Sequence, residues 1–63
     1  MMLQQAFLRS GTTVRTAWIG LKAKAGDQVT LKNSEDPHRR WNVVAVYARM
    51  PADQLHTDWH NNI

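Results

Sequence analysis

The residue types best suited to a binding site occur in one short run, Arg39-Arg40-Trp41. Guanidinium groups pair with phosphates, and both guanidinium and indole groups stack on bases, so the run predicts a contact with nucleic acid. Basic side chains from the first half of the chain would extend this contact. The candidate nucleic-acid-binding residues are therefore Arg15, Lys22, Lys24, Lys32, Arg39 and Arg40.

The same run also has a purely structural interpretation. Glu35 and Asp36 lie a few residues earlier, and across a hairpin they would neutralise the two arginines while Trp41 is buried in the core. An exposed ion pair of this kind contributes only about 0–1 kcal/mol to stability. Because no basic stripe surrounds the run in the sequence, the structural interpretation is favoured over the nucleic-acid contact.

Two histidines four residues apart, His56 and His60, would share one face of a helix and present both imidazoles to a metal ion. A zinc site needs three or four protein ligands, and the chain has no cysteine. The third ligand would have to be His38, Asp53 or a carboxylate of a neighbouring chain. We therefore expect solvent-facing histidines, and the sequence predicts neither a metal nor any other cofactor.

Groups that could catalyse a reaction are few. Ser10 and Ser34 sit in clusters of turn-forming residues, outside any strand-turn-helix elbow of the kind that presents a nucleophilic serine. Glu35 and Asp36 are adjacent on a turn, where neighbouring side chains diverge and both carboxylates stay hydrated. The glycines are too far apart to form a phosphate-binding loop. The sequence therefore predicts a protein that is not an enzyme and has no small-molecule substrate.

The length of the chain limits its stability. A chain of 63 residues makes one small domain. Such a domain buries only about 60% of the surface that its unfolded chain exposes, and one core then supplies roughly 3–5 kcal/mol. Without cysteine, no disulfide can add to this. Self-association and docking on a partner remain open as further sources of stability.

Charge is distributed unevenly along the chain, whose net charge is +3. Residues 1–34 carry five basic side chains against one acidic side chain, whereas residues 35–63 carry three basic against four acidic. A polyanionic partner would therefore meet mainly the first half. The excess is modest, so it does not by itself require such a partner.

The start of the chain is interrupted by polar side chains before an apolar stretch of signal-peptide length can form. No apolar run approaches the length needed to cross a bilayer. The sequence therefore predicts a cytoplasmic protein that makes no contact with membranes.

The elements that would position these groups are organised around one hairpin. Residues 28–32 and 40–48 have the composition of strands, and the polar residues 33–38 between them break the ladder. Val29 and Leu31 are expected to point inward. In residues 40–48 both faces carry apolar side chains, so we expect this strand to lie centrally with both faces covered. One face would hold Trp41, Val43, Ala45 and Tyr47, and the other Val44 and Val46.

Two strands are expected before the hairpin. Residues 3–9 alternate weakly, with Leu3, Gln5 and Phe7 on one side, and a turn signal follows at residues 10–12. Residues 13–19 have the β-branched and aromatic content of a strand. Its two faces would hold Val14, Thr16 and Trp18 on one side and Arg15, Ala17 and Ile19 on the other. Residues 20–26 are expected to form a loop.

The C-terminal residues have a helical pattern. Leu55, Trp59 and Ile63 fall at i, i+4 and i+8 after Pro51, so a short helix packed on the sheet would bury all three. If this tail is loose instead, Trp59 becomes an exposed anchor, and the three residues are the candidate protein-binding site. Trp18 and Trp41 are expected to be buried.

These elements predict a mainly β fold, a small SH3-like antiparallel barrel of about four to five strands. The barrel would span residues 1–50. A C-terminal helical or extended tail, residues 51–63, would pack on it.

One pattern is formed by Ala17-Trp18-Ile19, by Gly26, Val29, Leu31 and Lys32, by Arg40-Trp41-x-Val43 continuing to Val46-Tyr47, and by Ile63. This pattern resembles that of short bacteriophage proteins. The resemblance implies a phage accessory protein that acts inside an infected bacterium or in the virion, and it assigns no functional residue. Gly26-Asp27-x-Val29 is also similar to the entry of the SH3-like barrels in KOW-type proteins, but the glycine-rich continuation of that motif is absent here.

We therefore expect a non-catalytic binding module. Its partner would be a host or virion protein or a second copy of the chain, received by the C-terminal apolar residues and a sheet edge. The alternative is a small basic barrel that binds nucleic acid.

Overall fold

The computed structural model describes residues 1–32, 34–55 and 59–60. It contains five strands and one short 3-10 helix: β1 (Met2–Ser10), β2 (Thr13–Gly20), β3 (Gln28–Thr30), β4 (Arg40–Pro51), η1 (Ala52–Gln54) and β5 (Trp59–His60).

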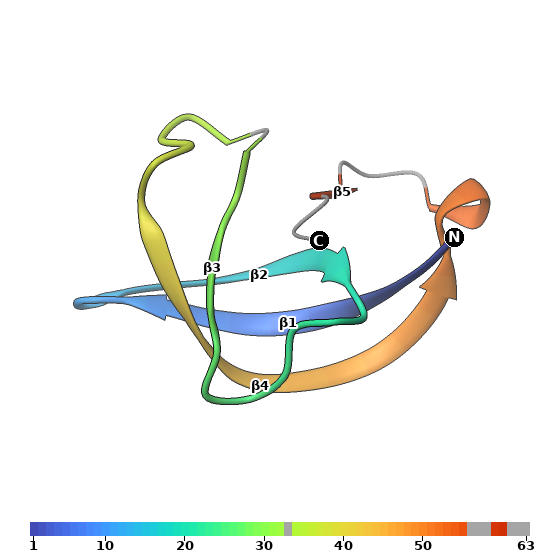
Figure 1. The fold of residues 1–63 in the computed structure, drawn as a ribbon, viewed down its shortest axis with the longest axis horizontal. Helices are drawn as coiled ribbons and strands as arrows, with labels where there is room; N and C mark the ends of the chain where they lie inside the picture. Colours follow the sequence, from blue (N-terminus) through green and yellow to red (C-terminus); the bar gives the residue numbers. More distant parts are fainter. Residues whose placement is uncertain (33, 56–58, 61–63) are drawn as a thin grey trace.

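All five strands belong to one sheet, in the order β3-β4-β1-β2-β5. The pairs β3–β4, β4–β1 and β1–β2 are antiparallel, and β5 pairs with β2 in parallel. The sheet curls into a half-barrel, with the long β4 sweeping around its outside (Figure 1). The expected fold class, a small mainly β barrel of four to five strands, is confirmed.

A two-residue turn joins β1 to β2. Ser10 and Thr13 form the last pair of the ladder, so Gly11 and Thr12 make the turn. Gly11 has a φ of 63°, and no residue other than glycine has a positive φ in the described part of the chain. A positive φ at the first central position alone is the sign pattern of a type II′ turn, whose twist matches that of the flanking strands.

Two β-bulges bend β4. Between Gln4 and Ala6 the partner on β4 moves from Arg49 to Val46, and between Phe7 and Leu8 it moves from Ala45 to Val43. At each place β4 has one more residue than β1. Bulges of this kind increase the local twist and bend the strand that carries them, which accounts for the curvature of β4.

The bulges also correct one expectation. β4 lies between β3 and β1, so its central position in the sheet is confirmed. Its second face is not covered, however, because Val44 is 48% exposed and Val46 is 38% exposed. Each extra residue shifts the alternation of inward and outward side chains, so this half of β4 does not bury both of its apolar faces.

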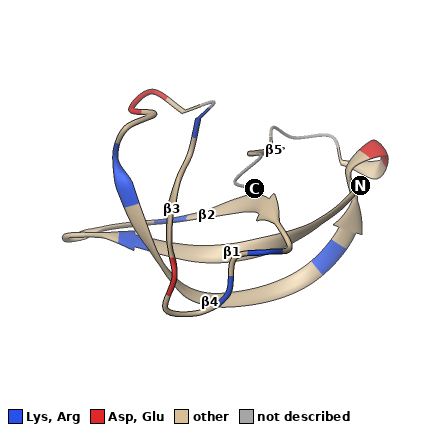
Figure 2. Ribbon diagram, in the orientation of Figure 1, with Lys and Arg blue, Asp and Glu red and all other residues tan. Residues whose placement is uncertain are grey.

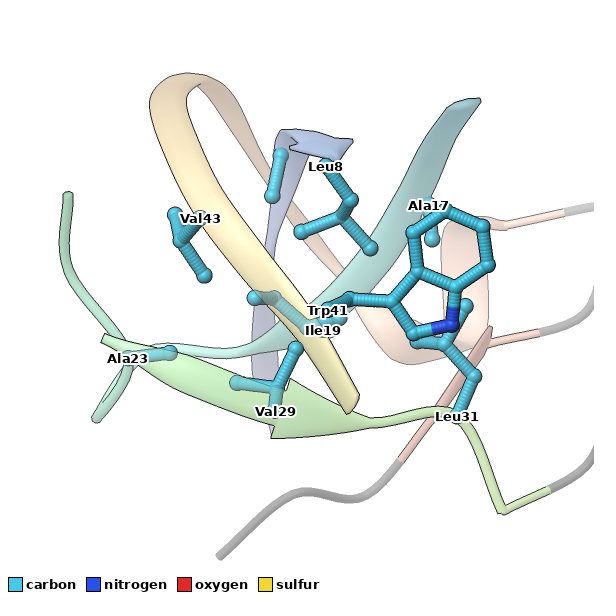
Figure 3. Packing of buried hydrophobic residues seen from close by; sticks show 9 residues of the cluster. Leu8, Ala17, Ile19, Ala23, Val29, Leu31, Trp41 and Val43 are labelled. Carbon is cyan, nitrogen blue, oxygen red and sulfur yellow. The ribbon is translucent and has the colours of Figure 1, made fainter. Parts of the chain in front are cut away.

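The concave side of the sheet holds the core, which includes Leu8 from β1, Val29 from β3 and Val43 from β4 (Figure 3). Val29 and Leu31 point inward as expected. On β1 the expected face is wrong in part, because Ala6 and Leu8 are buried together with Leu3, while Gln5 and Phe7 are half-buried. On β2, Ala17 and Ile19 are buried, and Trp18, expected to be buried, is half-buried on the opposite face.

A loop connects β2 to β3, in agreement with the loop expected for residues 20–26. This loop packs against the core. The side chain of Gln4, only 3% exposed, donates from Nε2 to the carbonyl oxygens of Gly20 (3.1 Å) and Ala23 (2.6 Å). The backbone N–H of Gly26 donates to the carbonyl of Val43 at 2.8 Å, and the N–H of Val43 donates to the carbonyl of Asp27 at 2.8 Å. These bonds lead the chain into β3.

The described residues of the C-terminal segment differ from the expected helix. Ala52–Gln54 is the 3-10 turn η1, and Trp59–His60 is a strand in which Trp59 lies opposite Trp18 and His60 opposite Ile19. Ile63 lies outside the described residues. No helix in the described part of the chain is long and apolar enough to span a membrane.

Candidate functional site

Trp41 is the centre of the candidate site. It points inward from the start of β4 and is 5% exposed, as expected for a core residue. Two guanidinium groups lie over its ring: the Cζ of Arg39 is 4.8 Å from the ring centroid, and the Cζ of Arg15 is 5.9 Å from it. Both distances are in the range of cation–π attraction.

The guanidinium group of Arg39 is held in place by the β1–β2 hairpin. Its Nε donates to Ser10 Oγ at 2.8 Å, and its Nη2 donates to the carbonyl oxygen of Ser10 at 3.0 Å. The local turn contributes as well, since the backbone N–H of Arg39 donates to the carbonyl of Asp36 at 3.2 Å. Two hydrogen bonds and a stacked ring restrict a side chain that otherwise has many rotamers.

Ser10 is a site residue that sequence reasoning missed. The sequence marks it only as part of a turn, and its partner Arg39 is 29 residues away. No local pattern signals such a pair. The contact follows from the sheet order, which brings the end of β1 beside the start of β4.

A hollow of about 220 Å³ opens over this end of the sheet. We refer to it as the Trp41 hollow; it is lined by Thr13, Arg15, Ser34, Glu35, Asp36, Arg39 and Trp41. It therefore combines two guanidinium groups, two carboxylates and two hydroxyl groups around an indole.

The structural interpretation of the arginine run is correct for Trp41 and wrong for the ion pairs. Within residues 1–32, 34–55 and 59–60, no ion pair joins Arg39 or Arg40 to Glu35 or Asp36. Arg39 turns to Ser10 instead. The two carboxylates therefore line the hollow without neutralising the arginines by direct contact.

Two further arginines lie on the outer face at the same end. Arg40, which is exposed, lies opposite Thr30 on β3, and Arg9 lies opposite Asn42 on β4. Residues directly opposite one another share a face, as do residues two apart in a strand. Arg9 and Arg40 are therefore on one face, and sequence reasoning did not select Arg9. We call Arg9, Arg15, Arg39 and Arg40 the arginine cluster.

The lysines are distributed differently. Lys22 and Lys24 lie in the β2–β3 loop, which follows the C-terminal end of β2, whereas Arg15 is near the N-terminal end of that strand. Lys32 follows β3, in the β3–β4 connection whose residues 34–36 line the hollow. Figure 2 shows the basic segments of β1 and of the first part of β4 near the β1–β2 turn, and those of the β2–β3 loop apart from them. The structure thus brings Arg15 and Arg39 together at Trp41 and places Arg40 on the outer face of the same sheet end. It separates Lys22 and Lys24 from all three.

The candidate protein-binding residues are less exposed than a free anchor would be. Leu55 is half-buried after η1, and Trp59 is half-buried in β5. The large apolar side chains that β4 exposes are Val44, Val46 and Tyr47, of which Tyr47 is 59% exposed. Sequence reasoning missed this surface because the bulges that create it are invisible in the strand pattern.

Only one of the two weak metal candidates lies in the described part of the structure. His56 lies outside the described residues, and the expectation that the histidines face solvent is wrong for His60, which is buried in β5. No group of three or more histidine, cysteine or acidic side chains suited to a metal occurs in the part of the chain that the structure describes.

No protein-family model, curated protein or solved structure matches this chain. A function for the chain must therefore be inferred from the geometry of the arginine cluster and of the Trp41 hollow.

Proposed function

We propose that the protein is a non-catalytic module that binds single-stranded nucleic acid through the arginine cluster. The observation that carries this proposal is the convergence of Arg15 and Arg39 on the ring of Trp41, with Arg40 next to it in the chain. Guanidinium groups held against an aromatic ring offer both charge for phosphates and a flat surface for bases.

The arrangement favours a single strand over a duplex. Bases can stack on guanidinium planes only where they are splayed out, as in single strands and loops. The arginines lie on both sides of the sheet end, with Arg9 and Arg40 on the outer face and Arg15 and Arg39 at the hollow. A flexible strand can follow such a curved surface, whereas a stiff duplex cannot.

The members of the cluster would contribute differently. Arg39 is already fixed by Ser10, so it would lose little further conformational freedom on binding. Arg15 and Arg40 are exposed, and neither makes a hydrogen bond to another described residue through its side chain. Both guanidinium groups are therefore free to contact the strand.

The proposal is tested by titrating labelled single-stranded oligonucleotides, DNA and RNA, at about 50 mM and about 200 mM salt. Arg15→Gln and Arg40→Gln are each expected to weaken binding. Arg40→Gln, on the outer face, should also reduce the slope of log K against log salt by about 0.7, the value for one phosphate contact to a single strand. Arg49→Gln is the matched control, since Arg49 is exposed on the same strand as Arg40 but pairs with Gln4, toward the other end of β1.

Two results would refute the proposal. The first is an unaltered protein that binds no oligonucleotide at low salt. The second is a control variant, Arg49→Gln, that weakens binding as much as Arg15→Gln and Arg40→Gln do, because charge alone and not the cluster would then explain the affinity.

A second candidate partner is a protein, or a second copy of the chain, that covers Val44, Val46 and Tyr47. The observation that favours it is the exposure of these apolar side chains on one strand. Light scattering of the purified protein tests self-association, and Val44→Thr with Val46→Thr should abolish any dimer. A pull-down from host lysate with and without nuclease separates a protein partner from nucleic acid.

The cellular setting is part of the proposal. The resemblance to short bacteriophage proteins points to an accessory protein that acts inside an infected bacterium, where single-stranded DNA and RNA intermediates are present.

A further inference from the structure

We infer that the Trp41 hollow receives a guanine base from the bound single strand. This inference depends on the proposed function and names the base that the arginine cluster would select. It is drawn from the mixture of groups around the hollow, which a simple phosphate site would not contain.

The carboxylates argue against a phosphate in the hollow. Glu35 and Asp36 form no ion pair and no hydrogen bond through their side chains with another described residue. An ionised carboxylate only accepts hydrogen bonds, so it repels a phosphate and attracts a group with adjacent N–H donors. The phosphates of the strand would therefore stay outside the hollow, near the outer arginines.

Guanine matches the acceptors best among the bases. Its Watson–Crick edge carries two neighbouring donors, the N1–H and the N2 amino group, which can meet one carboxylate with two hydrogen bonds. Thymine and uracil offer one N–H donor flanked by two carbonyl oxygens, which a carboxylate repels. Adenine and cytosine carry one amino group each and are intermediate.

The arginines supply the complementary donors. Guanine presents the acceptors O6 and N7 on its other edge, and a guanidinium group is the side chain that most often recognises them. The guanidinium group of Arg15 makes no hydrogen bond to another described residue, and Arg39 has Nη1 left after its two bonds to Ser10. Both line the hollow with Glu35 and Asp36.

The dimensions of the hollow fit one base. Sites for drug-sized ligands enclose about 300–1,000 Å³, so a hollow of about 220 Å³ is suited to one ring system. It is open to solvent, and its lining includes Thr13 at the start of β2 and Ser34, Glu35 and Asp36 from the β3–β4 connection. A base attached to a strand could enter it without the sugar.

The inference is tested with short thymidine oligonucleotides that carry one central guanine, hypoxanthine or thymine. Guanine is expected to bind about tenfold more tightly than thymine, a discrimination typical of one bidentate base contact. Hypoxanthine lacks the N2 amino group, so it should lose most of this preference. The same comparison in uridine oligonucleotides separates RNA from DNA as the natural strand.

Glu35→Gln and Asp36→Asn provide the decisive variants. Each removes a negative charge, so binding of the all-thymine oligonucleotide should become equal or tighter, while the preference for guanine should fall. Asp53→Asn, an exposed residue of η1 outside the hollow, is the control with the same charge change and should keep the preference.

The outcomes distinguish this inference from the function on which it depends. If every oligonucleotide binds equally, or if all three acidic variants change guanine and thymine binding in parallel, the hollow does not recognise guanine, although the arginine cluster still binds the strand. If no oligonucleotide binds at all, the proposed function and this inference are both wrong.

Discussion

Two polar side chains of this small protein each donate two hydrogen bonds to distant parts of the chain, but they have different roles. Gln4 donates twice to carbonyl oxygens of the β2–β3 region and is buried. Arg39 donates twice to Ser10 and lines an open hollow. Because Gln4 is buried, its hydrogen bonds stabilise the fold. Arg39 is partly exposed, so its charge and its remaining N–H donors can contact a partner.

Gln4 is a structural anchor and Arg39 a preorganised binding group, because the two side chains differ in burial. A buried amide is costly to remove because the buried carbonyl groups that it bonds lose a hydrogen bond that water does not readily replace. A partly exposed guanidinium is cheaper to remove because water can replace its bonds, but the binding surface then loses a fixed charge. The two anchors should therefore differ in which property their substitution changes.

The largest effect is expected at Gln4. Gln4→Ala leaves the buried carbonyl groups of Gly20 and Ala23 without the amide and should lower the free energy of unfolding by about 1–3 kcal/mol, a large share of the stability of a domain this small. Chemical denaturation followed by tryptophan fluorescence measures it. Gln5→Ala is the matched control, because Gln5 is half-buried and bonds no described residue through its side chain. Equal losses in both variants would contradict the structural role of Gln4.

An intermediate effect is expected at Arg39, and on binding more than on stability. Arg39→Lys keeps the charge but cannot reproduce the forked contact with Ser10 or the flat stack on Trp41. Affinity for single strands should fall about tenfold, as expected for the loss of one preorganised charged contact. Arg49→Lys should leave the affinity unchanged. An Arg39→Lys variant that binds normally would show that charge alone is needed.

The smallest effect is expected at Ser10. Ser10→Ala removes the Oγ acceptor but leaves the carbonyl oxygen that Arg39 also contacts, so the free energy of unfolding should fall by only about 0.5–1 kcal/mol. Binding should weaken less than in Arg39→Lys. Ser10→Thr restores the hydroxyl group and should rescue both properties in the same denaturation and titration assays. Failure of this rescue would mean that Ser10 does not position Arg39.

Much of the fold could be predicted from local patterns. The alternation of Val29 and Leu31 and the polar break after them were sufficient to predict the β3–β4 hairpin, and Gly11 marked the turn before β2. The inward face of β1 could not be predicted, because Leu3 and Phe7 suggest one face of an alternating strand, whereas Ala6 and Leu8 on the other face are buried. β5 could not be predicted either, since its two residues pair in parallel with β2 and have no pattern of their own.

The candidate site was predictable only in part. Arg39, Arg40 and Trp41 stood out because they are adjacent in the sequence, and Arg15 was selected for its charge. Ser10 and Arg9 were missed because the contacts that give them meaning cross the sheet. Lys22 and Lys24 were grouped with the arginines because of their charge, but the β2–β3 loop that carries them follows the end of β2 that is distant from Arg15.

The most direct test of the central claim is a titration of the isotope-labelled protein with a single-stranded oligonucleotide, followed by amide and indole NMR signals. The account predicts that the largest shifts occur at Ser10, Arg15 and Arg39 and at the indole Nε1–H of Trp41, which has no hydrogen-bond partner in the described structure. Shifts confined to the β2–β3 loop or to Val44–Tyr47, or no shifts at low salt, would contradict it.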